Sequence, residues 1–586
     1  MKYTVERNVQ ILISLLKQYG ISRVVASPGT ANMSFVASIQ NDDFFEIYSS
    51  IDERSAAYMA CGIASETNEP VVITCTEATA SRNYMPGLTE AYYRKLPVLA
   101  VMTSHGENLI GSFEPQVIDN RNIPNDIVNY SVKIQECKDK DDERYVEVHI
   151  NEAINHLTIN GGGPVRILLE SVNSYDYSAE FIPNANIIRI RSSVEDLPSI
   201  PEGNIVVFVG SHRKWASKEV EVLDKFCECN NAVVLCDMTS NYTGKYRVNY
   251  ALVSTQEGFR EFAKSPKLVI YIGNVSGDYY TSDFCRLAEQ EWVVSEDGGY
   301  RDRFHNLTEV IKMDEYQFFN NYCNTKHTNT SYYEELNEEY NKIRDLVPEL
   351  PFSNLWIASV SSQLVPKRST VHAAINNSLR SWNYFWKPDT VMHGSCNVGG
   401  YGIDGGLSTF IGASIVAPEK LFFIIIGDLA FFYDMNVLGN RHIGNNVRIL
   451  LINNGKGQEF RNYQHPASKF GEDADLYIAA GGHYACQSRN LVKGYAESLG
   501  YTYLSAENKE EYLSLYERFF SEENLNTPML FEVFTNTDDE NKALELVRNI
   551  VPKSTDMKNV TKEFAKKIIG KKAAHILKTL KTTVVG

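Results

Sequence analysis

The feature that most constrains the fold of this chain is a recurring short apolar run that ends at a turn residue. Runs rich in Val, Ile and Leu end in Gly, Pro, Ser or Asp, and the stretches between them are long enough for helices. Strands of a parallel sheet are covered by helices on both faces, so in a sequence they form continuous apolar runs. The pattern predicts an α/β protein made of parallel sheets with crossover helices.

The runs fall into three sets. The first set lies at 23–28, 70–75, 97–102 and 164–170, the second at 204–210, 231–237, 267–273 and 291–297, and the third at 389–394, 421–428, 447–454 and 529–534. A chain of 586 residues is too long for one hydrophobic core. We therefore predict three doubly wound parallel-sheet domains, at 1–180, 195–345 and 350–540. The polar segments 172–203 and 325–352 are predicted to be linkers or crossing segments.

Composition excludes several classes of protein. The 57 Lys and Arg residues against 73 Asp and Glu residues give a net charge of −16, which argues against a nucleic-acid-binding protein. The longest purely apolar run, 421–426, is far shorter than the ~20 residues that span a bilayer. Ten scattered cysteines do not form a disulfide framework, and the charged start of the chain has no apolar signal core. We expect a cytoplasmic protein.

The segment 541–586 is predicted to be a basic tail. From Lys553 onward it contains nine Lys residues against only Asp556 and Glu563. We interpret it as a solvated appendage. The alternative is a basic helix that contacts an anionic membrane surface or an acidic partner.

The third set of strands carries the most specific chemical pattern. The run 421–426 is followed by Gly427 and Asp428, and the next strand is followed by Asn454 and, after a glycine, Lys456. Carboxyl ends of adjacent parallel strands are where α/β sheets bind ligands. A carboxylate, an amide oxygen and a backbone carbonyl make an all-oxygen site of the kind that Mg²⁺ prefers. The alternative interpretation is two polar strand ends with an Asx turn.

In the first block, Glu53 opens a predicted helix whose early residues are small. Taken alone, acidic residues in a first helical turn indicate only a favourable interaction with the helix dipole. The alternative is that Glu53 is a catalytic carboxylate, and this interpretation needs further support from the sequence.

That support comes from a resemblance to thiamine-diphosphate enzymes over residues 1–540, and within them to the menaquinone-biosynthesis synthases that join 2-oxoglutarate to isochorismate. It rests on matching strings at both ends of the chain. They are SPGT at 27–30, IDERSAAYMACGIA at 51–64, TEATASRNYMPGLTEAYY at 76–93, PQVID at 115–119, GIDGGLST at 402–409, GDLAFFYDMN at 427–436 and NNGKGQEF at 453–460.

The resemblance implies roles for these residues. Glu53 would bond the aminopyrimidine of thiamine diphosphate and promote loss of the thiazolium C2 proton. Asp428, Asn454 and the carbonyl of Lys456 would bind Mg²⁺. Ile403 would hold the cofactor bent, and Gln116 would face the reacting carbonyl. The cofactor would also be lined by the backbone of Gly402, Gly427, Leu429 and Ala430.

The resemblance also implies an assembly. In the family, the first domain of one chain faces the third domain of its partner, so a homodimer or homotetramer with active sites at the subunit interface is expected. The middle block lacks a G-x-G-x-x-G motif, and we expect no FAD.

The chain departs from the family at four arginine positions. Three are occupied by Ala31, Gly106 and Val398, and a fourth falls near Trp382. Arginines at these places would clamp substrate carboxylates, and bidentate pairs of that kind have no simple substitute. His105 and His393 lie in or beside the altered strings, and we predict that they act in acid–base catalysis.

From retained cofactor motifs and lost arginines we predict a thiamine-diphosphate- and Mg²⁺-dependent enzyme that decarboxylates a 2-oxo acid. The resulting acyl unit would pass to an acceptor or be protonated to an aldehyde, and the substrate would differ from that of the menaquinone enzyme. The alternatives are the menaquinone synthase itself, a catalytically inactive scaffold that keeps the fold, and a flavin-carrying enzyme similar to acetolactate synthase.

Overall fold

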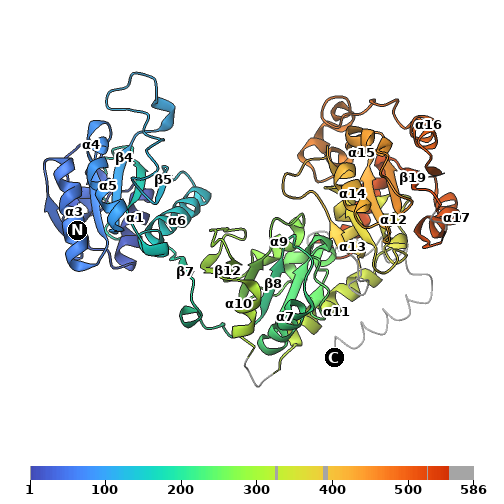
Figure 1. Cartoon of the computed structure of the whole chain (residues 1–586), viewed down its shortest axis with the longest axis horizontal. Helices are drawn as coiled ribbons and strands as arrows, with labels where there is room; N and C mark the ends of the chain where they lie inside the picture. The colour runs from blue at the N-terminus through green and yellow to red at the C-terminus, as the bar shows by residue number, and fades with distance from the viewer. Residues whose placement is uncertain (1, 324–327, 387–392, 524–525, 554–586) are drawn as a thin grey trace, which may run out of the picture. The chain divides into compact units, whose positions relative to one another are not determined.

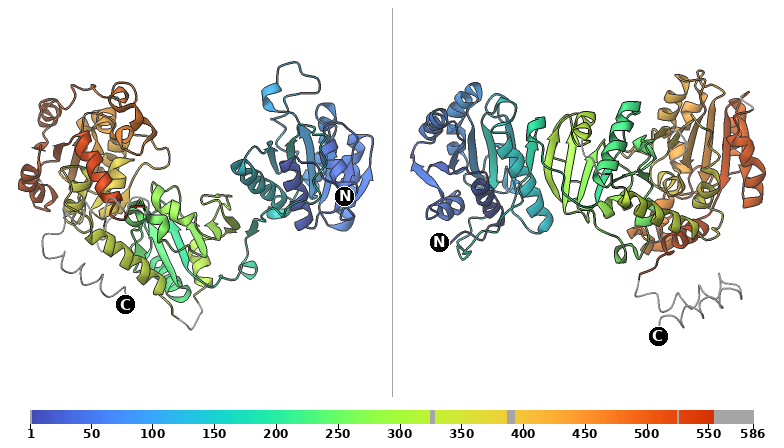
Figure 2. Two further views of the ribbon diagram at one scale, coloured as in Figure 1. Left: turned by 180° about the vertical axis from the view of Figure 1, so that it is seen from behind. Right: turned by 90° about the horizontal axis from the view of Figure 1, so that it is seen from below.

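The computed structural model describes residues 2–323, 328–386, 393–523 and 526–553 (Figures 1 and 2). The chain forms two compact units, which are Met1–Leu197 with Glu296–Lys312 and Pro198–Ser295 with Met313–Gly586. All strand pairs within the sheets are parallel, and helices alternate with the strands along the chain. The α/β fold with doubly wound parallel sheets is confirmed.

The first unit is built on a six-stranded sheet with the order β2-β1-β3-β4-β6-β5. Its strands are β1 (Arg23–Ala26), β2 (Glu46–Ser49), β3 (Val71–Cys75), β4 (Val98–Ser104), β5 (Tyr130–Ile134) and β6 (Val165–Glu170). The order reverses at β1, from which the chain first pairs to β2 on one side and then to β3 on the other. Ligands of such sheets bind beyond the carboxyl ends of the strands near this reversal.

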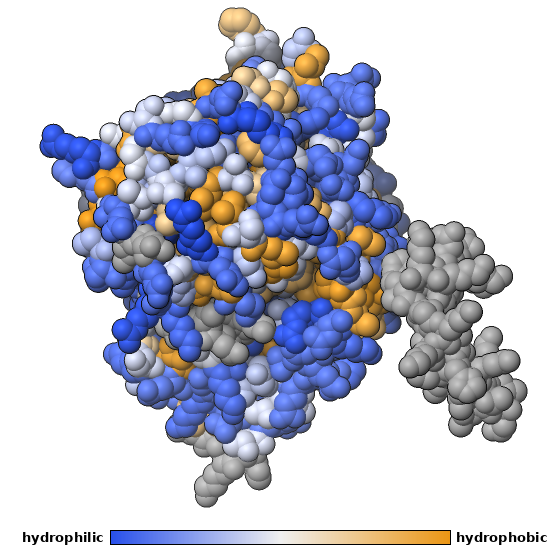
Figure 3. Space-filling model, turned by 90° about the vertical axis from the view of Figure 1, so that its right-hand side faces the viewer, coloured by the Kyte–Doolittle hydropathy of each residue, from blue (hydrophilic) through white to orange (hydrophobic). Residues whose placement is uncertain are grey.

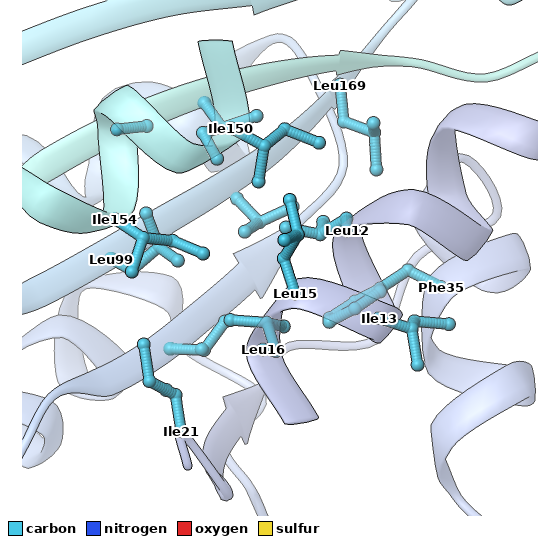
Figure 4. Close-up of a cluster of buried hydrophobic side chains, with 14 of the residues drawn as sticks. Leu12, Ile13, Leu15, Leu16, Ile21, Phe35, Leu99, Ile150, Ile154 and Leu169 are labelled. Carbon is cyan, nitrogen blue, oxygen red and sulfur yellow. The ribbon is translucent and has the colours of Figure 1, made fainter. Parts of the chain in front are cut away.

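Helices pack on both faces of this sheet because successive strand residues point to opposite sides. On one face, α1 (Arg7–Gln18) and α6 (Lys140–Asn155) enclose a core with α2 (Met33–Ile39), and Figure 4 shows its central side chains. On the other face lie α3 (Glu53–Thr67), α4 (Thr79–Asn83) and α5 (Met85–Arg94). The alternation explains why β3 and β4 consist of apolar residues almost throughout: both of their faces are buried.

The second unit contains a central sheet with the order β10-β9-β8-β11-β12. Its strands are β8 (Ile205–Val209), β9 (Ala232–Cys236), β10 (Arg247–Val248), β11 (Leu268–Ile272) and β12 (Gln290–Ser295), and its helices include α7 (Ser217–Asn230), α8 (Ala251–Ser254) and α9 (Tyr279–Cys285). In the first unit, β7 (Arg189–Arg191) pairs in parallel with β13 (Leu307–Lys312).

The third sheet also belongs to the second unit, and its order is β15-β14-β16-β17-β19-β18. Its strands are β14 (Thr370–Ala373), β15 (His393–Ser395), β16 (Phe422–Gly427), β17 (Val447–Asn453), β18 (Thr502–Ala506) and β19 (Met529–Phe534). Counted from its own first strand, this order is the same as that of the N-terminal sheet. The reversal lies at β14, and β16 is the strand beside it.

Helices of the third sheet follow the same alternation. They are α12 (Asn354–Ser361), α13 (Asn377–Phe385), α14 (Gly406–Ile415), α15 (Asp428–Asp434), α16 (Leu491–Ser498), α17 (Lys509–Phe520) and α18 (Thr537–Arg548). Helix α18 continues past residue 541, and the N–H of Gly258 binds the carbonyl of Val551 at 2.8 Å. The rest of the predicted basic tail, 554–586, lies outside the described residues.

The predicted strands agree with the structure wherever the runs were long and apolar. Five short strands, β2, β5, β10, β14 and β18, were missed because their runs are brief or carry polar residues, as were β7 and β13. The segment 325–352 is not simply a linker, because α11 (Ser331–Asp345) forms there. Its buried residues Tyr332, Leu336, Tyr340 and Ile343 follow a helical period on one face.

The structure also describes the helices, the surface and the cysteines on which the compositional argument was based. Among the described residues, no helix is both long and apolar enough to cross a membrane. The face drawn in Figure 3 shows small hydrophobic patches separated by hydrophilic residues. All ten cysteines lie in the described part of the chain, and no disulfide joins any two of them there.

Candidate active site

The carboxyl edge of the third sheet carries the acidic residue that was predicted to bind a metal. Strand β16 ends at Gly427 and helix α15 begins at Asp428, beside the reversal of strand order. Asp428 is 4% exposed. Its Oδ1 accepts a hydrogen bond from the backbone N–H of Leu429 at 2.9 Å, and its Oδ2 accepts one from Gly455 at 2.6 Å.

The surroundings of this carboxylate suit a cation. Burial, helped by the charge of Glu532, raises the pKa of Asp428 to about 7, although hydrogen bonds from backbone N–H groups oppose the rise. All of the hydrogen-bond donors named for Asp428 are neutral. A buried carboxylate held by neutral donors is stabilised in its charged form when a divalent ion binds it.

The turn after β17 brings the other predicted ligands to the same place. Asn454 Oδ1 accepts a hydrogen bond from the N–H of Lys456 at 3.3 Å, and this tight turn requires a positive φ of 80° at Gly455. A Cβ on Gly455 would also meet the side chains of Cys486 and Gln487 at 3.2 Å. Asn454 and Lys456 therefore flank Gly455, the residue whose N–H bonds Asp428.

The donor set fits Mg²⁺ by its chemistry. Among the described residues, no group of three His, Cys, Asp or Glu side chains could hold a metal ion. A site at this edge therefore relies on one carboxylate together with amide and carbonyl oxygens, and such a set leaves positions for phosphate oxygens and water.

The segment after the turn is held by two ion pairs with Asp475. This carboxylate accepts a hydrogen bond from Lys456 Nζ at 2.7 Å and also pairs with Arg461, and the two cations lower its pKa although its partial burial opposes them. His465 Nδ1 accepts a hydrogen bond from the N–H of Ala467 at 3.1 Å and so caps the 3₁₀ helix Pro466–Ala474. The Lys456 side chain is thus paired with Asp475.

The other cofactor residues of the second unit lie before α14. The Gly402–Gly405 turn places Ile403 half-buried against the core of the third sheet. In the helix that follows this turn, Ser408 donates hydrogen bonds from its N–H and its hydroxyl to the Asp434 carboxylate, both at 2.6 Å. This bridge ties the GIDGGLST string to the GDLAFFYDMN string, and sequence reasoning missed it although both residues stand inside quoted motifs.

Glu53 is the first residue of α3, as predicted, and it lies half-buried in the first unit. Asp52 caps the helix by accepting a hydrogen bond from the N–H of Arg54 at 3.0 Å. Asn83 Nδ2 of α4 donates to Glu53 Oε2 at 3.4 Å. Helices α3 and α5 also pack closely here, since a Cβ on Gly87 of α5 would lie 2.4 Å from the Cβ of Ala57.

His105 has a partner that the sequence did not single out. Its Nδ1 lies 3.2 Å from Oε2 of Glu77, and its backbone N–H donates to the same oxygen at 2.9 Å. Glu77 is buried at the end of β3 and His105 follows β4, so the pair joins two adjacent strand ends. A carboxylate that orients an imidazole is an arrangement suited to acid–base chemistry. Glu77 was recognisable only as part of the TEATA string.

Two further residues, Gln116 and His393, were predicted to act in catalysis. Gln116 is exposed, with a φ of 67°, on the segment between β4 and β5. His393 begins β15 and pairs with Thr370, and its side chain lies outside the described residues. The roles of Gln116 and His393 in catalysis stay predictions.

Three of the four positions at which the family has an arginine are occupied here by buried residues. Ala31 and Val398 are buried, and Trp382 is fully buried against Phe520. Two residues earlier on the same helix, Arg380 makes a bidentate pair with Glu459, with Nη–Oε distances of 2.9 and 3.0 Å. The arginine of α13 thus stands two residues before the position at which the resemblance placed it.

The structure brings the predicted residues together in two groups. The first unit holds Glu53 and His105, which Asn83 and Glu77 contact. The second unit holds the remaining cofactor residues, with Asp428, Asn454 and Lys456 at one strand edge and Gly402 and Ile403 in the turn before α14.

Comparisons with known proteins agree with these motifs. Residues 7–123 match the family model "Thiamine pyrophosphate enzyme, N-terminal TPP binding domain". The chain is similar to the protein named 2-succinyl-5-enolpyruvyl-6-hydroxy-3-cyclohexene-1-carboxylate synthase from Phocaeicola vulgatus, with 30% identity over 92% of this chain and 98% of that protein. It is 29% identical to the protein of the same name from Bacteroides fragilis, over 93% of this chain and 98% of the relative.

These matches contradict the prediction of a substrate different from that of the menaquinone enzyme. Relatives with one and the same synthase name cover nearly the whole chain, from the first domain to the third. The prediction gave too much weight to aligned arginine positions. A substrate clamp is defined by where guanidinium groups lie in space, and positions aligned in a sequence do not establish that.

Proposed function

Because the chain belongs to the family of 2-succinyl-5-enolpyruvyl-6-hydroxy-3-cyclohexene-1-carboxylate synthases, which are thiamine-diphosphate enzymes, we propose that it catalyses this synthase's reaction in menaquinone biosynthesis. In that reaction 2-oxoglutarate loses CO₂, and its remaining acyl unit is joined to isochorismate. Thiamine diphosphate, when bound, supplies the electron sink that stabilises the acyl carbanion.

The observation that carries the proposal is the combination of full-length similarity with a coherent cofactor site. The relatives align with more than nine-tenths of the chain. In the second unit, Asp428 and Gly455 join the two strand ends that would carry Mg²⁺. Asp428, Asn454 and the carbonyl of Lys456 would bind the metal, which would hold the diphosphate at the edge of the sheet.

On this proposal, Glu53 holds the proton at the aminopyrimidine nitrogen. Its carboxylate is positioned by Asn83, and its place at the first turn of α3 keeps it half-buried rather than fully solvated. His105, oriented by Glu77, is the candidate to move a proton near the substrate. Since Glu53 and Asp428 belong to different compact units, we propose that they complete one site between two subunits.

A genetic and a biochemical experiment test the proposal together. Expression of the chain in a bacterium that lacks this synthase should restore menaquinone formation, and an Asp428→Ala variant should not. The purified protein should release CO₂ from 2-oxoglutarate in the presence of isochorismate, thiamine diphosphate and Mg²⁺. Preference for pyruvate, oxaloacetate or phosphonopyruvate over 2-oxoglutarate, with no rescue, would refute the proposed reaction.

A further inference from the structure

The N-terminal unit contains a cavity of about 260 Å³ that no residue of the candidate active site fills. It lies on the face of the sheet that α3, α4 and α5 cover, between α4, α5 and the segment 120–127. Its apolar wall is formed by Met85, Leu88, Met102, Ile123 and Ile127. An internal space with one apolar wall and a few polar groups is the usual form of a small-molecule site.

The polar end of the cavity is formed by Arg166, a cation buried without a charged partner. Arg166 is 3% exposed and extends from β6. Its Nε donates to Ser131 Oγ at 2.8 Å, and its Nη atoms donate to the carbonyls of Asn120 and Arg121 at 2.8 and 3.3 Å. These acceptors are neutral, and burial lowers the pKa of Arg166 to about 10. No ion pair between Arg166 and a carboxylate occurs among the described residues.

Two neighbours add to the positive character of this end. The Nδ2 atom of Asn120 is buried without a hydrogen-bond partner, and the residue is 8% exposed. Arg82 lines the cavity, and its guanidinium donates to the backbone carbonyl of Asp119 at 3.4 Å. The Asp119 carboxylate is bound by Arg121 at 2.8 and 2.9 Å. An unpaired buried cation and an unpaired buried donor both cost free energy that an anion would offset.

We propose that this cavity is a binding site for a small carboxylate with an apolar body. The carboxylate accepts hydrogen bonds from Arg166 and Asn120, and the body packs against Met85 and Leu88. A guanidinium suits this headgroup because it donates two parallel hydrogen bonds to a carboxylate. The apolar wall disfavours phosphate and short hydrophilic acids, which would leave that wall uncovered.

This site is separate from the proposed active site. Arg166 stands four residues before Glu170, the last residue of β6, and therefore lies ~13 Å along the strand from the carboxyl edge. His105 and Glu77 are at that edge. The proposal concerns binding alone, so its test does not depend on whether the chain catalyses the synthase reaction.

Calorimetry on the full-length protein, saturated with thiamine diphosphate and Mg²⁺, tests the proposal. Benzoate is the probe, benzamide is its neutral counterpart, and acetate has the headgroup without the body. We expect benzoate to bind once per chain and both comparison compounds to bind at least ~10-fold more weakly, since each loses one part of the recognition. Absence of benzoate binding, or equal binding of benzamide, would overturn the proposal.

Three variants locate the binding. Arg166→Met should weaken benzoate at least ~10-fold by removing the charged hydrogen bonds. Ile123→Trp should block the cavity without touching Arg166. The matched control is Arg448→Met, because Arg448 of β17 is also a buried arginine bound to neutral carbonyls, in the second unit. Its benzoate affinity should equal that of the wild type.

Two variants of the cavity are used so that one can still test the site if the other does not fold. If Arg166→Met does not fold, as judged by near-UV circular dichroism, Ile123→Trp alone decides. Wild-type affinity for benzoate in a folded Arg166→Met or Ile123→Trp protein would show that the anion binds elsewhere and would refute the site.

Discussion

Asp428 and Gly455 are joined by a hydrogen bond of 2.6 Å from the Gly455 N–H to the Asp428 Oδ2, although 27 residues separate them in sequence. The bond connects the ends of β16 and β17, which are neighbours in the sheet. It therefore holds the carboxylate and the Asn454 turn as one unit, and both would move if either changed.

The first prediction concerns this unit. Asp428→Ala should abolish Mg²⁺-dependent binding of thiamine diphosphate, because the diphosphate would lose its bridging cation. Calorimetry with and without EDTA measures this, and circular dichroism should show an intact fold. The control is Asp473→Asn, an exposed acid on the nearby 3₁₀ helix, which should bind like the wild type. Unchanged cofactor affinity in Asp428→Ala would remove this residue from the metal site.

The second prediction concerns Glu53. Glu53→Gln should bind the cofactor nearly normally and lose ~10²–10⁴-fold in kcat, because an amide cannot exchange the required proton. Steady-state kinetics and calorimetry on the same preparation separate the two effects. Glu66→Gln changes an exposed acid of the same helix and should leave both unchanged. A fully active Glu53→Gln enzyme would contradict the assigned role.

The third prediction concerns assembly. Glu53→Gln and Asp428→Ala chains are each expected to be inactive, but after subunit exchange one of the two sites in a mixed dimer has only unmutated parts. Random mixing should therefore recover about a quarter of wild-type activity. Exchange is followed by mass spectrometry of differently tagged chains. Mixed dimers that form and remain inactive would show that each site is built within one chain.

The fourth prediction concerns the pair of His105 and Glu77. Glu77→Gln removes the charge that orients the imidazole, so it should change the pH dependence of kcat and not only its size. His105→Gln should lower kcat at least ~10-fold, because an amide cannot transfer the proton, and its pH profile of kcat should also differ from that of the wild type. If both variants lose only thermal stability and retain the wild-type pH profile, the pair is structural.

The fifth prediction concerns acid stability. Burial lowers the pKa of His372 on β14 to about 4, whereas in the unfolded chain it is near ~6.5. The unfolded state therefore takes up the proton first, and the contribution of His372 to stability is full above pH ~6.5 and is lost as pH falls toward 4, by about 2–4 kcal/mol. Denaturant unfolding at several pH values measures the change.

The matched variant for this prediction is His372→Leu, which cannot take up a proton. Its free energy of unfolding should fall less between pH 6.5 and pH 4 than that of the wild type. Asp278 has a pKa raised to about 6 by burial and responds in the opposite sense, so the difference between the two proteins, rather than either curve alone, is the test. Parallel curves would show that His372 does not titrate as described.

Local patterns in the sequence were sufficient for the parts of the fold that repeat. Strands such as β16 and β17 are apolar on both faces, because helices cover both sides of a parallel sheet, and so their runs were recognisable. The strand-end motifs at Asp428 and Asn454 followed from the same rule. The short strand β14 carries Thr370 and His372, and it was missed because the burial of the polar His372 is decided by neighbours far along the chain.

Only the tertiary structure decided which side chains meet. The sequence by itself determined that Glu53 opens a helix and that Asp428 and Asn454 directly follow strands. It could not show that Glu77 holds His105, because the two residues come from different strands. Nor could it show that Arg166 faces a cavity without a carboxylate. Such contacts depend on strand order and register, and strand order arises from packing across the whole domain rather than from any one segment.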